Sequence, residues 1–482
     1  MLFNSLDFAV FLPIVFVLYW FVFKNQLKAQ NILIVIASYI FYGWWDWRFL
    51  SLIAFSTIVD FFIGRKLSNE SNSNNRKLLL WTSIFVNLGF LGFFKYYNFF
   101  LDNFITAFSF FGNEIKANSL NIILPVGISF YTFQTLSYTI DVYRKKLKPT
   151  SDFFAFTAFV SFFPQLVAGP IERATNLLPQ FYKKRTFDYR SSIDGLRQIL
   201  WGLFKKIVIA DNCAVYANLI FNNSDDYSGS TLILGAIFFT FQIYGDFSGY
   251  SDIAIGTSRL FGFDLKQNFA FPYFSRNIAE FWRRWHISLS SWFKDYVYIP
   301  LGGSRGGILK KIKNTFIIFV VSGFWHGANW TFIIWGALNA IYFLPLLLTN
   351  RNRNYIEIVA NNKFFPNFKE IIQMLVTFSL TILAWIFFRA NNVGHAFSIL
   401  EEVFSKSTLS IPSFEGFTKS MIIILMIFFF ISVEWLGRRG KFALEKIYVV
   451  KFRFIRWSFY LLLVIIIIIF GASQQDFIYF QF

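Results

Sequence analysis

The stretch EFWRRWHISLSSWFKDYVYIPLGGSRGG (residues 280–307), followed by KKIKNTFIIFVVSGFWHGAN (residues 310–329), governs how the rest of this chain is interpreted. It contains two of the three histidines, His286 and His326, among tryptophans, serines and glycines in a sequence of membrane-spanning character. An ionisable side chain at bilayer depth is costly, so it is a candidate functional group by default. The remaining sequence is therefore expected to form a scaffold that positions these two imidazoles.

The composition is that of a helical membrane protein. Hydrophobic residues make up 56% of the 482 residues and charged residues only 15%, whereas about a quarter of a soluble chain is charged. The apolar segments are long and continuous, as in YLLLVIIIIIF (residues 460–470), unlike the alternating strands of a transmembrane barrel. The sequence therefore predicts an all-α polytopic integral membrane protein.

The formal net charge is +18, and its distribution indicates lipid and not nucleic acid as the partner. The basic residues lie in short clusters between apolar runs, as positive-inside topology and contact with anionic lipid require. A second interpretation, in which a basic cytoplasmic face docks an acidic donor protein, stays open. Lys24, Lys28 and the polar segment at residues 65–77 are expected in the cytoplasm, which places the N-terminus outside.

Several apolar runs are interrupted by proline and glycine. Pro125 and Gly127 break one run, and Pro164 breaks the next. The apolar stretch at residues 315–348 would be about 50 Å long as one helix, so it should break near GANW (residues 327–330). Broken helices at membrane depth persist where protein or a water-filled cavity satisfies the backbone, so these breaks indicate a cavity.

The chain is predicted to form a single domain over residues 1–482, with about a dozen crossings or half-crossings. The motifs that carry chemistry lie within residues 125–336, and further spans lie within residues 370–472.

His326 lies in VSGFWHGANW, where small residues surround the imidazole. If the helix continues through the motif, Ser322 and Asn329 lie one turn away and can hold one ring nitrogen while the other accepts a proton. Gly323 and Gly327 form a GxxxG pattern that lets a second helix or a substrate chain approach the backbone. A buried histidine that only bridges helices is the structural alternative.

His286 lies in a segment with the pattern of an interfacial helix, tryptophan on one face and arginine on the other. Glu280 and Arg284 have the i,i+4 spacing of an ion pair. A lipid-surface helix with an incidental histidine explains this pattern, although it does not explain the glycines of PLGG (residues 300–303). The apolar face is expected to comprise Trp282, Trp285, Leu289 and Trp292.

Asp246 and Asp252 lie in FQIYGDFSGYSDIAIG with Tyr250, in an otherwise apolar run. These carboxylates could orient a histidine or bind a sugar hydroxyl, and they could equally pair with Arg283 or Arg284 and hold helices together.

Two further residues are interpreted as structural. The single cysteine, Cys213, excludes an intramolecular disulfide and is expected to be a buried helix residue and not a thioester nucleophile. His395 is expected at the surface in a polar loop. The sequence contains no HExxH, no P-loop and no carboxylate cluster with metal spacing, so no metal site is expected.

Five stretches together resemble the membrane-bound O-acyltransferase family, most closely its alginate O-acetyltransferase branch. They are PVGISFYTFQTLSYTIDVYR, FFPQLVAGPIER, YGDFSGYSDIAIG, NFAFPYFSRNIAEFWRRWHISLSSWFKDYVYIPLGG and GFWHGANWTFIIWG. The resemblance implies a helical bundle around a central funnel or tunnel, with re-entrant and interfacial helices, in the bacterial inner membrane.

The resemblance also implies a reaction, in which an acetyl group moves from a cytoplasmic thioester to a hydroxyl of an extracytoplasmic polysaccharide, directly or through a relay protein. His326 matches the catalytic histidine of the family, and His286 matches its second recurrent histidine. No bound cofactor is expected, because the donor, acetyl-CoA or an acyl carrier protein thioester, is a co-substrate. The residues expected to bind or position substrate are Asp246, Tyr250, Asp252, Asn329, Trp325 and Ser322.

Three alternatives remain open. The branch that transfers D-alanine to teichoic acid shares these motifs. A transporter could use the same histidines as a proton relay, and a membrane partner could merely anchor an extracellular transferase.

Overall fold

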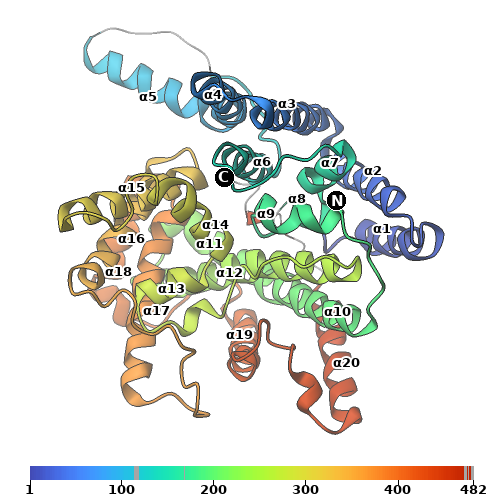
Figure 1. The fold of residues 1–482 in the computed structure, drawn as a ribbon. Helices are drawn as coiled ribbons and strands as arrows, with labels where there is room; N and C mark the ends of the chain where they lie inside the picture. The colour runs from blue at the N-terminus through green and yellow to red at the C-terminus, as the bar shows by residue number, and fades with distance from the viewer. Residues whose placement is uncertain (113–118, 168, 472–474, 476, 479–482) are drawn as a thin grey trace. The chain divides into compact units, whose positions relative to one another are not determined.

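The computed structural model describes residues 1–112, 119–167, 169–471, 475, 477 and 478 (Figure 1). Within these residues the secondary structure is helical and contains no β-strand, which confirms the all-α prediction. The chain forms two compact units. The first comprises residues 1–193 and 257–266, and the second comprises residues 194–256 and 267–482. The single domain predicted from the sequence stays a prediction.

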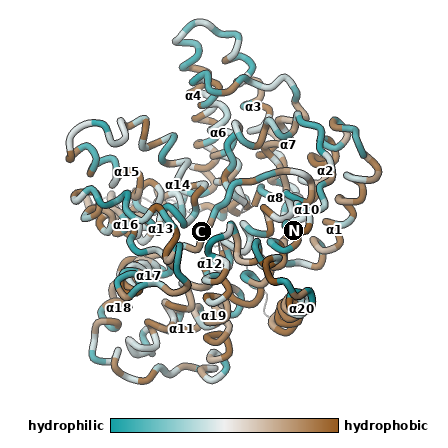
Figure 2. Tube along the Cα trace, turned by 60° about the horizontal axis from the view of Figure 1, so that its bottom comes forward, coloured by the Kyte–Doolittle hydropathy of each residue, from teal (hydrophilic) through white to brown (hydrophobic). Residues whose placement is uncertain are grey.

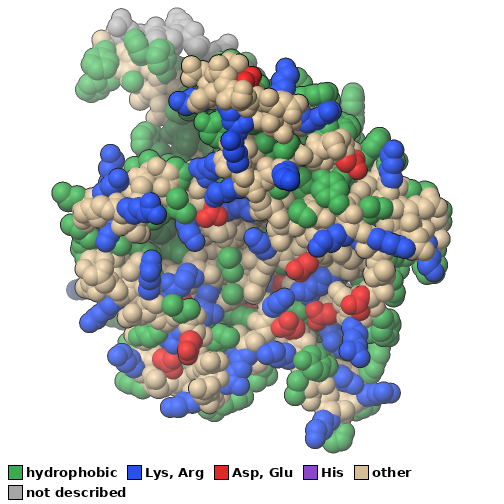
Figure 3. All heavy atoms as spheres, in the orientation of Figure 1, with side chains coloured by type: hydrophobic (Ala, Val, Ile, Leu, Met, Phe, Trp, Pro, Cys, Tyr) green, Lys and Arg blue, Asp and Glu red, His purple; other side chains and the backbone are tan. Residues whose placement is uncertain are grey.

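Seven helical segments in the described part of the chain are long and apolar enough to cross a membrane, which confirms an integral membrane protein. They are residues 27–69, 73–110, 229–260, 330–348, 368–389, 417–437 and 453–470. The last of these, α20 (Arg453–Phe470), is hydrophobic along most of its length (Figure 2). Shorter apolar helices at Leu6–Val22 and Phe153–Leu166 suit partial crossings. On the face shown in Figure 3, Lys and Arg side chains outnumber Asp and Glu, as the net charge requires.

The first unit is built from short and long helices that follow the predicted apolar runs. They are α1 (Leu6–Val17), α2 (Leu27–Asp46), α3 (Leu50–Asn69), α4 (Ser73–Leu91), α5 (Tyr97–Phe110), α6 (Ile128–Tyr143), α7 (Phe153–Ser161), α8 (Phe163–Leu166) and α9 (Ala174–Leu177). The polar segment at residues 65–77 is mostly helical and not a loop, since α3 continues to Asn69 and α4 begins at Ser73.

The predicted helix breaks are present in this unit. Gly127 adopts a left-handed conformation with φ of 74° directly before α6. A Cβ at this position would lie 2.7 Å from the carbonyl oxygen of Leu166, so only glycine fits. The break between α7 and α8 falls at Phe162, and the next backbone N–H, that of Phe163, donates to Ser38 Oγ at 3.0 Å. Protein groups thus satisfy the backbone where the helices are interrupted.

A buried polar network joins three helices of the first unit. The carboxylate of Asp60 on α3 accepts hydrogen bonds from Ser83 and Asn87 on α4 and from Thr139 on α6. Thr135, also on α6, donates to Asn87 Oδ1 at 3.0 Å. Because an unpaired polar group is costly in an apolar interior, this network fixes which faces of the three helices meet.

The second unit contains the longest helices and the candidate site. Its elements are most of α10 (Tyr189–Leu203), the π-helical segment η5 (Phe204–Ala210), α11 (Asp211–Asn222), most of α12 (Gly229–Leu260), α13 (Ile278–Arg284), α14 (Ile287–Phe293), α15 (Ile308–His326), α16 (Trp330–Leu348), α17 (Phe368–Arg389), α18 (Val393–Val403), α19 (Phe417–Gly437) and α20. The apolar stretch at residues 315–348 is divided between α15 and α16, as predicted.

Glycines let α15 and α16 pack closely. A Cβ on Gly323 would overlap the carbonyl oxygen of Phe332, and one on Gly336 would overlap that of Phe319. The predicted approach of a second helix at Gly323 is therefore present, and the approaching helix is the next one in the chain. Gly327 lies beyond the end of α15 in an extended conformation, so the GxxxG pattern does not act as one helical face.

We expect Asp60→Ala to destabilise the protein. The substitution leaves the donors of Ser83, Asn87 and Thr139 buried without their acceptor, and each unmet group costs about 1–3 kcal/mol. The unfolding temperature in detergent, followed by tryptophan fluorescence, should fall well below that of the wild type. Asp102→Ala, at an exposed position of α5, is the control. Equal unfolding temperatures for the two variants would contradict the role of this network.

Candidate active site

His326 is the last residue of α15, and its side chain is only 3% exposed. Aromatic rings from three helices surround the imidazole. The centroid distances are 4.9 Å to Trp325, 5.2 Å to Trp335 on α16 and 5.3 Å to Phe388 on α17. The packing of α16 and α17 on the end of α15 therefore excludes bulk water from this ring.

The partners predicted for His326 are only partly where the sequence suggested. Ser322 does lie one turn before His326 on α15. Asn329 does not lie one turn after it, because the helix ends at His326 and the next residue is extended. Instead Asn329 caps α16 by accepting the backbone N–H of Thr331 at 3.0 Å, and its amide donates to the carbonyl oxygen of Asn391 at 2.9 Å. The prediction that helical spacing places Asn329 beside His326 is wrong.

His286 is 1% exposed and lies at a sharp break between α13 and α14. Its φ of 44° is in the left-handed region, which is strained for a residue with a side chain. The predicted single helix with one tryptophan face is therefore wrong, and Trp285, Leu289 and Trp292 are buried inside the protein and do not face lipid. The predicted ion pair between Glu280 and Arg284 is present at 2.8 Å.

Asn268 fixes the orientation of the His286 ring, and the sequence analysis did not single it out. Asn268 Oδ1 lies 3.1 Å from His286 Nδ1 and also accepts from the Ser288 backbone N–H. Since a backbone N–H must donate, this atom is an oxygen, and His286 Nδ1 therefore carries the proton. In the described part of the chain, Nε2 has no hydrogen-bond partner. Burial lowers the pKa of His286 well below its ordinary value, so the ring is neutral and Nε2 presents a lone pair.

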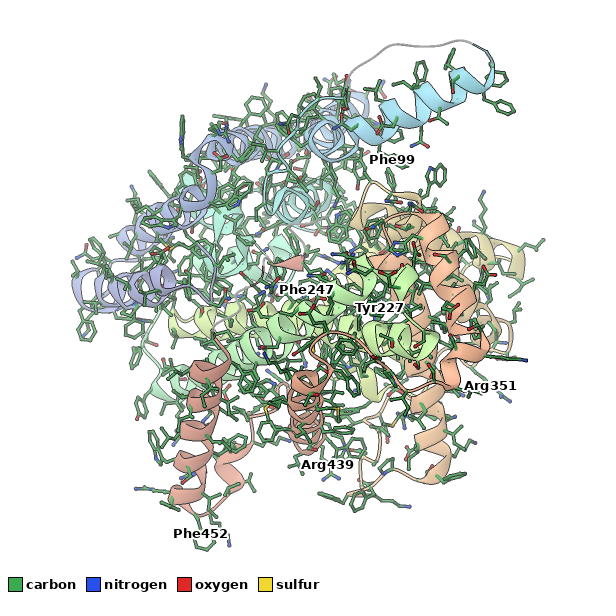
Figure 4. All side chains as sticks on the ribbon, turned by 180° about the vertical axis from the view of Figure 1, so that it is seen from behind. Phe99, Tyr227, Phe247, Arg351, Arg439 and Phe452 are labelled. Atoms are coloured by element: carbon green, nitrogen blue, oxygen red, sulfur yellow. The ribbon has the colours of Figure 1, made fainter. Side chains whose placement is uncertain are left out.

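Trp325 connects the two histidines. Its ring centroid lies 4.9 Å from that of His326 and 6.1 Å from that of His286. Phe247, which projects from α12 and is labelled in Figure 4, packs edge-on against His286 at 4.5 Å. The structure thus brings the two histidines and Trp325 into one aromatic cluster, although they come from different elements.

The two aspartates of α12 form buried ion pairs with lysines. Asp252 Oδ2 lies 2.5 Å from Lys205 Nζ, and its Oδ1 accepts from Gln198 Nε2 at 2.7 Å. Asp246 Oδ1 lies 2.7 Å from Lys206 Nζ, which also contacts Asp211 at 2.8 Å.

Of the two predicted roles, the structure shows that these carboxylates hold helices together. The predicted partners, Arg283 or Arg284, are wrong. Arg283 instead donates to backbone carbonyl oxygens at residues 352, 354 and 355. The sequence does contain a signal for the true partners, namely the pair of lysines in the otherwise apolar run WGLFKKIVIA (residues 201–210). Tyr250 is also buried, and its ring packs on Phe477 with centroids 4.3 Å apart.

Two pockets have lining residues connected to the His326 region, Ser322 on α15 in the first and Asn391, which accepts from Asn329, in the second. The first, the basic-rim pocket, has a volume of about 330 Å³. Its wall is apolar and reaches Ser322, and its rim carries Arg283, Lys294 and Arg353. The apolar wall includes Trp282, Phe293, Ile318, Phe319 and Phe343.

The second, the polar pocket, has a volume of about 450 Å³. Its lining comprises Phe221, Asn222, Asn223, Ser224, Asp225, Asp226, Asn391, Asn392, His395 and Ser398.

The structure also shows where Cys213 and His395 lie. Cys213 is fully buried in α11, as predicted. His395 is half-buried in the first turn of α18, so its assignment to a polar loop is wrong. Its Nδ1 accepts the Asn391 backbone N–H at 3.2 Å, which leaves Nε2–H to donate to Ser224 Oγ at 3.0 Å. The described residues contain no group of three or more His, Cys, Asp or Glu side chains placed to hold a metal ion.

A helical membrane fold with two buried histidines in one aromatic cluster fits an integral membrane acyltransferase, and the comparison with known families identifies that class. Residues 144–388, which include both histidines, match MBOAT, the membrane-bound O-acyltransferase family, and the chain belongs to this family. The resemblance noted from the sequence is thereby confirmed.

Several named relatives are similar over more than half of this chain. The "Probable alginate O-acetylase AlgI" of Pseudomonas aeruginosa is 39% identical over 412 residues, which cover 85% of this chain and 76% of the relative. The "Peptidoglycan O-acetyltransferase" of Helicobacter pylori is 38% identical over 433 residues, which cover 83% and 79%. The "Teichoic acid D-alanyltransferase" of Bacillus subtilis is 28% identical over 290 residues, which cover 57% and 71%.

We expect Asp252→Ala to lose stability, because it removes the carboxylate that forms the ion pair with the buried Lys205. Breaking one partner of a buried ion pair costs about 3–5 kcal/mol. Membrane abundance and unfolding temperature should both fall, while Glu415→Ala, at an exposed position, should leave both unchanged. If Asp252→Ala instead remains stable and loses only acceptor binding, the carboxylate binds substrate and is not structural.

Proposed function

We propose that this protein transfers an acetyl group from a cytoplasmic thioester to hydroxyl groups of an extracytoplasmic polysaccharide, across a bacterial inner membrane. One observation carries the proposal. A buried histidine cluster adjoins a basic-rim pocket through Ser322 and a polar pocket through Asn329 and Asn391, in a chain of the MBOAT family. The relatives named for alginate and peptidoglycan O-acetylation support acetyl as the group and polysaccharide as the acceptor.

The charges at the helix ends of the second unit support this orientation. Lysines 310, 311 and 313 lie at the start of α15, and arginines 351 and 353 follow the end of α16. Arginines 438 and 439 end α19, and Lys451 precedes α20. Positive-inside bias places these ends in the cytoplasm. His326 lies at the opposite end of α15 from the lysines, so it faces the outer half of the membrane.

The basic-rim pocket suits the donor. Acetyl-CoA and an acylated carrier protein both present a phosphopantetheine arm, which combines an extended, largely apolar chain with a phosphate. The pocket offers an apolar wall that reaches Ser322, one turn from His326, and a rim with Lys294 and Arg353 for the phosphate. An acyl carrier protein would also use the basic cytoplasmic ends of the helices.

The reaction needs one base and one positioned acceptor. The imidazole of His326 takes the proton of the acceptor hydroxyl, whose oxygen attacks the thioester carbonyl carbon. The C–S bond then breaks, and the thiolate receives the proton from the imidazolium. His286, oriented by Asn268, is positioned beside Trp325 and supports the arrangement around His326. The lining of neither pocket includes His326, so we expect one of the aromatic rings around it to rotate before the substrates meet.

We expect His326→Ala to reduce acetyl transfer by at least about 100-fold, since general-base assistance supplies about 10²–10⁴-fold. The assay follows label from [¹⁴C]acetyl donor into extracellular glycan in membrane vesicles. Cys213→Ala should retain full transfer, because that thiol is buried and forms no thioester intermediate.

Normal acetylation by His326→Ala at normal abundance would overturn the mechanism. Parallel vesicles with labelled D-alanine test the D-alanyl alternative, and movement of unmodified substrate without glycan label would indicate a transporter. Label that appears only when an extracellular transferase is present would indicate an anchoring or relayed role.

We expect the double variant Lys294→Glu, Arg353→Glu to raise the KM for the donor about tenfold or more, with little change in kcat, because each substitution replaces a phosphate contact with repulsion. Acetyl-CoA and an acetylated carrier protein should be assayed separately. Lys451→Glu, Arg453→Glu carries the same charge change outside the pocket and is the control. An unchanged KM for both donors would show that the donor binds elsewhere.

A further inference from the structure

The polar pocket adjoins the end of α15 at which His326 lies. Asn391, which lines the pocket, accepts a hydrogen bond from the amide of Asn329, three residues beyond His326. Phe388, three residues before Asn391, packs on the His326 ring at 5.3 Å. The pocket is therefore joined to the histidine by two short chain segments, on the side away from the lysine-bearing end of the helix.

The lining of the polar pocket is suited to hydroxyl and amide groups. Every lining residue except Phe221 has a polar side chain, and most are asparagine, aspartate or serine. Asparagine amides donate and accept, carboxylates accept from hydroxyls, and a single aromatic ring can pack on the C–H face of a pyranose. The volume of about 450 Å³ falls in the usual range for small-molecule sites, about 300–1,000 Å³.

The charge of the lining is negative. Asp225 and Asp226 contribute two carboxylates, and within the described residues neither side chain forms a hydrogen bond or an ion pair. The lining contains no Lys or Arg. Arg389, at the end of α17, donates to Asn218 and to the lining residue Asn222, but its own side chain is not part of the lining.

His395 adds no positive charge to the pocket at neutral pH. Burial, with a smaller contribution from Arg389, lowers the pKa of this imidazole. Its two ring nitrogens are also both engaged, with Ser224 and the Asn391 backbone.

We propose that the polar pocket is the acceptor subsite and that it selects a neutral or N-acetylated sugar over a polyuronate. The inference rests on the proposed function and deepens it, since it names the class of acceptor. Hydroxyl and acetamido groups pair with the asparagines and with Asp225 and Asp226. A polyuronate such as alginate carries one carboxylate per residue, which these aspartates repel, so charge discriminates between the two acceptors.

The test measures binding to the full-length protein in lipid nanodiscs by saturation-transfer NMR, with two tetrasaccharides at one ionic strength. The N-acetylglucosamine tetramer should bind about tenfold or more tightly than the mannuronate tetramer. Asp225→Asn, Asp226→Asn should reduce that preference about fivefold or more, because it removes both charges while it retains the shape. Glu401→Gln, a carboxylate on α18 outside the pocket, should leave the preference unchanged.

Transfer to the same tetrasaccharides separates the outcomes. His326→Ala should still bind the N-acetylglucosamine tetramer, since the pocket is intact. If that variant binds and also transfers acetyl normally, the role of His326 as base fails while the subsite stands. If the wild type binds the N-acetylglucosamine tetramer but transfers no acetyl group from any donor, the proposed function fails while the subsite stands. If the wild type binds neither tetramer, prefers mannuronate, or keeps its preference in the double aspartate variant, the subsite is overturned. Acetylation of a serine-bearing relay protein without binding of either sugar would likewise overturn it.

Discussion

Two buried lysine–aspartate pairs are the constraint on which the second unit depends. Asp246 and Asp252 lie six residues apart on α12, about 9 Å along its axis. Their partners, Lys205 and Lys206, are adjacent in the π-helical segment η5. A charge removed from water without a partner is not tolerated, so the segment and α12 can pack in only one register. Two glycines reinforce that register, Gly202 on α10 and Gly249 on α12. The two helices approach so closely at these positions that there is no room for a larger side chain.

That register determines where the histidine cluster forms. Phe247, on the turn of α12 between the two aspartates, packs against His286, and Ser251 accepts the amide of the Asn268 that orients the same ring. Contacts with α12, the helix that carries the two ion-paired aspartates, therefore position His286. The strained backbone at His286 is stabilised by the same contacts, since Asn268 also accepts both the N–H and the hydroxyl of Ser288.

The surroundings of His326 depend on a different feature, the close approach of two helices at glycine residues. Gly323 and Gly336 allow α15 and α16 to touch, which brings Trp335 onto His326. The ring thus sits in an aromatic enclosure that adjoins a pocket with a cationic rim and a pocket with an anionic lining. Opposite charges in the two pockets suit the proposed reaction, in which the donor is a phosphate-bearing thioester and the acceptor is an alcohol.

The sequence by itself determined the membrane class, the helical architecture and the break between α15 and α16, and it singled out both histidines as candidates. These follow from local properties: hydrophobic length, helix-breaking residues and the cost of a polar group at membrane depth. It could not determine the break at His286, because the helical periodicity of the sequence continues through this left-handed residue. The contacts of His286 with Asn268 and Phe247 come from distant parts of the chain. The sequence also named arginines as partners for Asp246 and Asp252 where the fold supplies lysines. Only tertiary structure decides such pairings, since they depend on which distant helix brings its charge within reach once the apolar faces have packed.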